Sequence, residues 1–176
     1  LYRGLRLLAE TAQGGVVNAL AREGGLSSTF WAGPESFSKQ MKSGLEPVQG
    51  GPRHKPIRMN LGFADEDFAY SISLGLPPPG DAGHSKFSLD PQIKRECIWA
   101  GPSFRPASLL VDRQGSLVKI RDGRKWQVIE QHLSAFDSIF SQLADPQAAP
   151  EIMVLRERIR GWRFYDHFRT DESSPA

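Results

Sequence analysis

Apolar side chains recur every three or four residues along the start of the chain. The positions are Leu1, Leu5, Leu8, Ala12, Val16, Ala19 and Leu20. This spacing gathers the apolar side chains on one side of a helix, so we expect a helix from Leu1 to about Arg22 that packs against a core. Gly14 and Gly15 weaken its middle, because a glycine costs about 1 kcal/mol relative to alanine inside a helix.

The middle of the chain changes to an alternation of apolar and polar positions, which is typical of strands with one buried and one solvated face. The pattern predicts a hairpin over 59–76 around an acidic turn at 64–67, a strand over 93–100, a second hairpin over 109–120 that turns at 112–115, and a short strand over 126–129. Between helix and strands, residues 27–56 show little periodicity and predict a long surface connection.

Helical spacing returns in the last part of the chain. Ser134 is placed to cap a short helix that ends near Leu143, and Pro150 suits the first position of another helix, which Gly161 ends. An aromatic run over 162–168 follows in an extended form. We therefore expect an α+β fragment of an α/β protein: an N-terminal helix, five or six mainly antiparallel strands, and further helices.

Composition narrows the classes of function. The 22 Lys and Arg against 20 Asp and Glu give a net charge of +2, far from that of a dedicated nucleic-acid binder. The single cysteine, Cys97, excludes an internal disulfide framework and fits a reducing compartment. No apolar run approaches the ~20 residues of a membrane-spanning helix, and no secretory signal pattern is visible. We expect a cytoplasmic protein that makes no membrane contact.

Basic residues nevertheless gather locally. If the last helix continues to Arg163, then Arg156, Arg160 and Arg163 share one face. Such a stripe can contact phosphates, and the alternative is a solvated helix face interleaved with Glu151 and Glu157. Two further basic clusters lie over 53–58 and 119–125.

The sequence contains no complete active site. Its four histidines stand in different predicted segments, at His54, His84, His132 and His167. Asp166 and His167 are adjacent, but neighbours on a strand point to opposite faces. Cys97 alternates with a tryptophan in a predicted strand, so we interpret it as a small core residue and not as a nucleophile. The acidic turn 65–67 either holds a cation or is a solvated hairpin loop. We expect no metal site and no self-sufficient enzyme.

Two stretches resemble a known family. The first ten residues, LYRGLRLLAE, resemble the helix that directly follows the P-loop in predicted AAA-type ATPases of the ATP-binding-cassette head group, which are related to RecF-like and SMC-like proteins. The stretches FSQLADP at 140–146 and WRFYDHF at 162–168 are similar to the same family. The resemblance in order and spacing covers essentially the whole chain.

The resemblance implies a partial ATPase head domain over 1–176. Residues 1–130 would supply the helix and antiparallel sheet of the first lobe, and residues 133–176 would begin the helical second lobe. The longer parent would bind ATP and Mg²⁺, hydrolyse ATP at the interface of a head–head homodimer, and couple hydrolysis to DNA maintenance or to a partner protein.

Two candidate sites also follow from the resemblance. Leu1, Tyr2 and Arg3 would begin the helix after the phosphate loop and lie beside the nucleotide. Gln142 would be the glutamine at the lobe junction that senses Mg²⁺ and the γ-phosphate in such heads. The alternative for Gln142 is a surface glutamine in a short helix.

The chain departs from the family pattern at the residues that do the chemistry. The phosphate-loop sequence Gly-Lys-Ser-Asn, the Walker B acid and the cassette signature are absent from the sequence. No capping residue precedes Leu1, so we expect that the first helix has lost its preceding loop. The 176 residues alone are expected to bind no cofactor and to be inactive.

Two hypotheses from other classes remain open. One is a non-enzymatic α+β module that binds nucleic acid through the arginine stripe and the basic clusters. The other is a protein-interaction domain that uses the aromatic run over 162–168.

Overall fold

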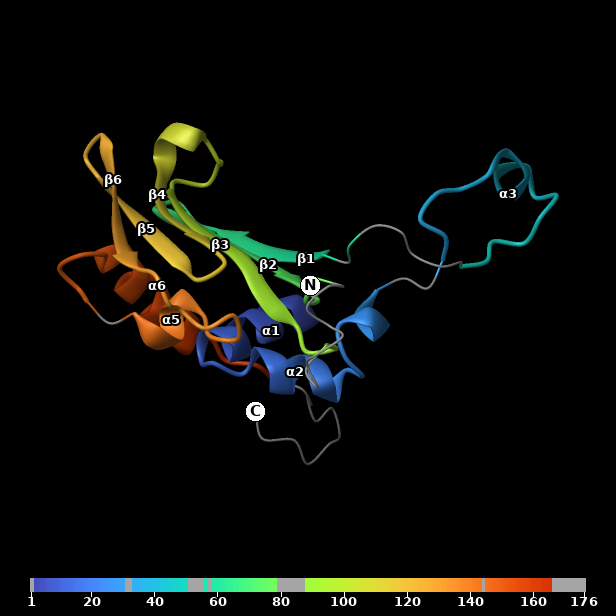
Figure 1. Cartoon of the computed structure of the whole chain (residues 1–176), viewed down its shortest axis with the longest axis horizontal. Coiled ribbons are helices and arrows are strands. Elements are labelled where there is room, and N and C mark those ends of the chain that lie inside the picture. The colour runs from blue at the N-terminus through green and yellow to red at the C-terminus, as the bar shows by residue number, and fades with distance from the viewer. Residues whose placement is uncertain are drawn as a thin grey trace, which may run out of the picture.

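The fold is a six-stranded antiparallel sheet with helices against one face (Figure 1). The computed structural model describes residues 2–30, 33–50, 56, 58–78, 88–143 and 145–165. The strands follow chain order across the sheet: β1 (Arg58–Ala64), β2 (Phe68–Gly75), β3 (Gln92–Ala100), β4 (Leu109–Gln114), β5 (Leu117–Asp122) and β6 (Lys125–Glu130). The predicted α+β arrangement is therefore confirmed. The strands follow chain order because antiparallel neighbours need only short connections.

The N-terminal segment forms two helices and not one. These are α1 (Tyr2–Ala12) and α2 (Val16–Arg22), separated at Gly14 with a φ of 82°. That left-handed backbone conformation favours glycine and cannot continue a right-handed helix. The prediction of one helix from Leu1 to Arg22 is therefore wrong at the glycine pair, although both helices bury their apolar stripe.

The connection after α2 contains two short elements, the 3₁₀ helix η1 (Ser27–Thr29) and α3 (Lys39–Ser43). Ser38 caps α3, since its Oγ accepts a hydrogen bond from the Met41 backbone N–H at 3.0 Å. In Figure 1 the part of this connection that contains α3 extends away from the sheet and the other helices. A second 3₁₀ helix, η2 (Pro106–Ser108), precedes β4.

Two further helices follow the sheet, α5 (Ile139–Gln142) and α6 (Pro150–Arg160). Helix α6 begins and ends where the sequence predicts. The cap of α5 is Ser138 and not Ser134: the Ser138 Oγ accepts from the Phe140 N–H at 3.2 Å, whereas Ser134 stabilises the turn before it. The helix start predicted from the sequence, at Ser134, is therefore one turn too early. Both serines are residue types that suit a cap.

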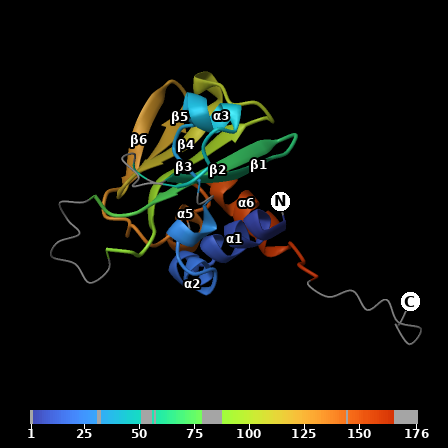
Figure 2. The same ribbon diagram turned by 90° about the vertical axis from the view of Figure 1, so that its right-hand side faces the viewer.

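Helices α1, α2, α5 and α6 lie against one face of the sheet (Figure 2). Their buried side chains share a single hydrophobic core with that face. Leu8 of α1, Ile72 of β2, Phe140 of α5 and Leu155 of α6 belong to it, and each is at most 2% exposed. Residues on both sides of the expected lobe boundary near 130 therefore contribute to one core. The division into two lobes of a larger head stays a prediction.

A buried ion pair joins the sheet to the start of α5. Arg113 of β4 and Glu96 of β3 are both fully buried, and the Arg113 guanidinium donates to the Glu96 carboxylate at 2.6 Å. The predicted hairpin turn at 112–115 is wrong at this point, because β4 continues to Gln114 and the chain turns at Gly115 with a φ of 61°. A residue expected in a hairpin turn thus lies in the core.

The acidic turn between β1 and β2 contacts the far end of the chain. The Arg158 guanidinium of α6 forms an ion pair with the Asp65 carboxylate, and its Nη2 lies 3.8 Å from an oxygen of Asp67. These carboxylates therefore have a cationic partner within the chain. These ion pairs connect the β1–β2 hairpin to α6.

The aromatic residues after α6 pack back onto the fold. The Trp162 ring lies edge-on to Phe63 with centroids 5.0 Å apart, and Phe164 lies edge-on to Tyr2 at 5.6 Å. These two rings contact the chain's own core. The rest of the run, over 166–168, lies outside the described residues.

Candidate functional site

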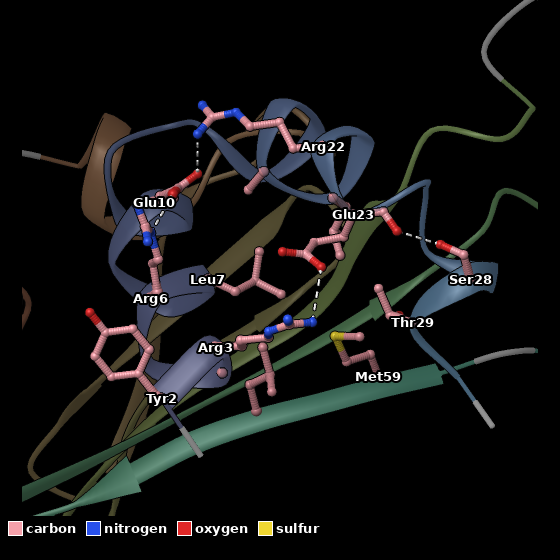
Figure 3. Close-up of a pocket in the computed structure, with 14 residues that line it drawn as sticks. Tyr2, Arg3, Arg6, Leu7, Glu10, Arg22, Glu23, Ser28, Thr29 and Met59 are labelled. Atoms are coloured by element: carbon pink, nitrogen blue, oxygen red, sulfur yellow. Dashed lines mark hydrogen bonds and ion pairs between the residues drawn. The ribbon is translucent and has the colours of Figure 1, made fainter. Parts of the chain in front are cut away.

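A groove of about 700 Å³ opens between α1, α2, η1 and the edge strand β1 (Figure 3). Leu7 of α1 and Met59 and Leu61 of β1 give it an apolar floor. Ser28 and Thr29 stand at its far end, with their hydroxyl groups donating to backbone carbonyls of the same turn. A groove of this size is within the range that small-molecule ligands occupy.

Five charged side chains surround the groove, and their ion pairs are long. Arg3 lies 3.5 Å from Glu23, while Glu10 is shared by Arg6 at 3.5 Å and Arg22 at 3.6 Å (Figure 3). The Arg3 side chain is 87% exposed. Exposed pairs of this kind contribute at most about 1 kcal/mol each, so an anion can compete for the arginines.

The start of α1 adds a second favourable feature for an anion. Its first turn contains Arg3 and no acidic residue. The free N–H groups of a helix start and its partial positive charge attract anions, and a basic side chain there is unfavourable unless an anion is near. The geometry at this end of the groove therefore suits a phosphate or carboxylate group.

The structure brings together some of the predicted site residues and separates others. Tyr2 and Arg3 both line the groove, whereas Leu1 lies outside the described residues. Gln142 is exposed at the end of α5. Its neighbour Ser141 lies beside Gly14, after the opposite end of α1, and a helix of 11 residues is about 16 Å long. The role of Gln142 stays a prediction, and this arrangement does not place it with Tyr2 and Arg3.

The condition for the arginine stripe, a last helix that continues to Arg163, is not met. Helix α6 ends at Arg160, so Arg163 follows it in an irregular segment after Gly161. Arg156 is only 7% exposed and donates to the Leu143 carbonyl. The face of α6 that bears Arg156 packs toward α5, which is why this arginine is buried and unavailable to a phosphate.

No match was found when the chain was compared with protein-family models, with curated proteins and with solved structures. In the part of the chain that the structure describes, no group of three metal-ligating side chains comes together. Within the same residues, no helix has the length and apolar character needed to cross a bilayer.

Cys97 is buried, as expected, but it is not part of the hydrophobic core that the helices share with the sheet. Its side chain lies beside Asp112 on the opposite face of β3. Cys97 is 4% exposed, and its Sγ lies 3.3 Å from a carboxylate oxygen of Asp112. Burial, together with the negative charge of Asp112, raises the pKa of the thiol to about 12. The thiol therefore stays protonated near neutral pH and is a poor nucleophile.

This raised pKa predicts a measurable loss of stability with pH. The unfolded thiol ionises from about pH 9, while the folded thiol ionises only near 12, so the free energy of unfolding falls as pH rises through this window. Between about pH 10 and 11, where the unfolded thiol is almost fully ionised, the fall approaches 1.4 kcal/mol per pH unit. Denaturant titration at several pH values measures it, and Cys97→Ala should flatten the profile there. An unchanged profile in that variant would contradict the assignment.

Of the four histidines, the structure describes His132. His54, His84 and the pair Asp166 and His167 lie outside the described residues. His132 is exposed after β6, where its backbone N–H donates to Glu130.

Of the residues that line the groove, only Tyr2 and Arg3 were candidates from the sequence. Arg3, Arg6 and Glu10 recur at i, i+3 and i+7, a spacing that places them on one helix face and could have indicated a polar site. Glu23 and Met59 gave no such signal, since they come from separate elements and meet the groove only through packing.

Proposed function

We propose that this chain is part of an ATP-binding head domain of the AAA and ATP-binding-cassette type, with the phosphates of ATP at the start of α1. One observation carries the proposal: the first turn of α1 contains Arg3 and no acidic residue, and it opens on the groove. The resemblance of the first ten residues to the helix after a phosphate loop supports the same position.

The residues of the groove fit a nucleotide phosphate. Arg3 and Arg6 would neutralise its charge, the helix start would donate hydrogen bonds, and Leu7 and Met59 would exclude water from one side. They do not fit Mg²⁺, because Glu10 and Glu23 are paired with arginines and no cluster of three ligands exists among the described residues. We therefore assign the metal ligands to the phosphate loop and Walker B acid of a longer parent, and derive no step through the metal.

The remaining parts of the proposal follow from the resemblance alone. The parent would act in the cytoplasm and hydrolyse ATP as a head–head homodimer, coupled to DNA maintenance or to a partner protein. The 176 residues without the phosphate loop would be inactive.

The first experiment is to determine the coding sequence upstream of Leu1. We expect a Gly-x-x-Gly-x-Gly-Lys-Ser/Thr motif within about ten residues of Leu1, since the phosphate loop leads directly into its helix. The absence of this motif would overturn the proposal.

The second experiment measures ATP binding by the longer chain with isothermal titration calorimetry. Arg3→Glu should weaken binding by about 5- to 10-fold, which corresponds to about 1–1.4 kcal/mol. Lys42→Glu makes the same charge change on α3, remote from the groove, and should leave affinity unchanged. Equal effects of both variants would show that the groove is not the phosphate site.

A further inference from the structure

The face of the sheet opposite the hydrophobic core carries none of the helices α1, α2, α5 and α6 (Figures 1 and 2). The 3₁₀ helix η2 lies at its β5 end, where the Pro106 carbonyl accepts a hydrogen bond from Arg121 at 3.3 Å. Tyr70, Ile72 and Leu74 of β2 point into the core, so Ser71 and Ser73 between them point to this outer face. Residues paired with one another on neighbouring strands point to the same side of the sheet, so the strand register identifies the outer-face residues of the other strands. We define the open face by these serines and by the residues in line with them: Arg58, Asn60, Arg95, Cys97, Trp99, Asp112, Lys119, Arg121, Trp126 and Val128.

The open face is strongly basic for a chain of almost balanced charge. It contains four cations, Arg58, Arg95, Lys119 and Arg121, and its only carboxylate is Asp112. Arg95 is paired with Asp112 at 2.9 Å. Arg58 makes no side-chain hydrogen bond or ion pair with any described residue and is exposed. The chain as a whole has a net charge of only +2, so positive charge is concentrated here.

Aromatic side chains lie among these cations. Trp99 and Phe104 meet edge-on with centroids 5.4 Å apart, and both line a trough of about 430 Å³ together with Arg58 and Arg95. Phe104 is 52% exposed. At the other edge Trp126 is 42% exposed and lies under the Arg121 guanidinium at 5.8 Å.

Cations beside exposed aromatic rings suit a flexible polyanion whose bases are free to stack. In single-stranded nucleic acid the phosphates bind basic side chains while unpaired bases stack on aromatic rings. In a duplex the bases are stacked inside and cannot reach rings on a sheet surface. An acidic peptide would use the cations but would gain nothing specific from Phe104.

We propose that the open face binds a single strand of nucleic acid, with phosphates at Arg58 and Arg95 and a base on Phe104. This surface is not the arginine stripe of the last helix that the sequence suggested. That stripe does not form, because α6 ends before Arg163 and Arg156 is buried. It is independent of the proposed ATP site, because the groove lies on the helix-bearing side of β1 and shares no residue with the trough.

The test is fluorescence anisotropy of the 176-residue chain with a labelled oligothymidine of about 15 nucleotides. Raising salt from about 50 to about 200 mM should weaken binding about ten-fold if two to three phosphates are contacted. Arg58→Glu should weaken it about ten-fold and lower the slope of log affinity against log salt by about 0.7. Arg160→Glu makes the same charge change on α6 and should have little effect.

Substitutions of Phe104 separate a nucleic acid from an acidic protein. Phe104→Leu should weaken binding at least about five-fold, because it removes the stacking ring, and Phe104→Tyr should retain it. Circular dichroism checks that each variant is folded.

Four outcomes would overturn the proposal: no binding at about 100 μM chain, equal losses from Arg58→Glu and Arg160→Glu, equal affinity for duplex DNA, or unchanged binding by Phe104→Leu. The last result, with competition by polyglutamate, would assign the face to an acidic partner.

Discussion

Replacing Arg113 by methionine should lower the free energy of unfolding by about 3–5 kcal/mol, the cost of leaving a charge buried without its partner. The Glu96 carboxylate is fully buried, and the substitution removes the donor at 2.6 Å. It also removes donors to three backbone carbonyls, those of Gly115, Ser134 and Asp137. Urea titration followed by circular dichroism measures the change.

The other hydrogen bonds to Glu96 explain why the loss of unfolding free energy should be so large. Its carboxylate also accepts from the Tyr70 hydroxyl and the Ser138 hydroxyl, each at 2.6 Å, and from the Ile139 backbone N–H at 3.1 Å. Burial, and then the negative charge of Glu96, raise the pKa of Tyr70 well above its ordinary value and keep this donor protonated. One carboxylate thus holds β2, β4 and the start of α5 together.

Two control variants test this explanation. Arg95→Met removes an ion pair whose arginine is 46% exposed, so it should cost at most about 1 kcal/mol. Glu96→Leu combined with Arg113→Met removes both charges and should recover part of the single-variant loss. Equal losses of unfolding free energy for Arg95→Met and Arg113→Met would show that the buried ion pair contributes no more to stability than the exposed one.

Truncating Phe140 to alanine should lower the free energy of unfolding by about 3–5 kcal/mol, because it removes a large buried ring and leaves a cavity. Phe140 is 1% exposed, and its ring lies 4.7 Å from that of Tyr70, between α5 and the sheet. Since one core joins the sheet to α5 and α6, unfolding should remain a single transition. Tryptophan fluorescence and circular dichroism should give coincident curves.

Val154→Ala provides the matched control for this truncation. Val154 lies on α6 with 45% of its surface exposed, so its replacement should change stability by no more than about 0.5 kcal/mol. Separate transitions for the sheet and for residues 133–165 would contradict a shared core. They would instead favour a boundary between two lobes near residue 130.

Local patterns predicted the strands well, because alternation reports burial on one face and needs no knowledge of distant residues. They failed where the relevant partner is remote in sequence. Arg113 was expected in a hairpin turn, but it lies in β4 and pairs with Glu96, 17 residues away on β3. Both alternatives for Arg156 placed it on an exposed helix face, but it is buried and contacts Leu143, 13 residues earlier.

The amino-acid sequence by itself determined the order of the elements, the α+β class and the resemblance of its first helix to one that follows a phosphate loop. Only the tertiary structure decided where charge is concentrated and exposed. The groove at Arg3 exists because α2 and β1 pack beside α1, and the basic open face exists because α1, α2, α5 and α6 gather on the other side of the sheet. Both surfaces depend on which elements meet in space, and no short stretch of sequence encodes that choice.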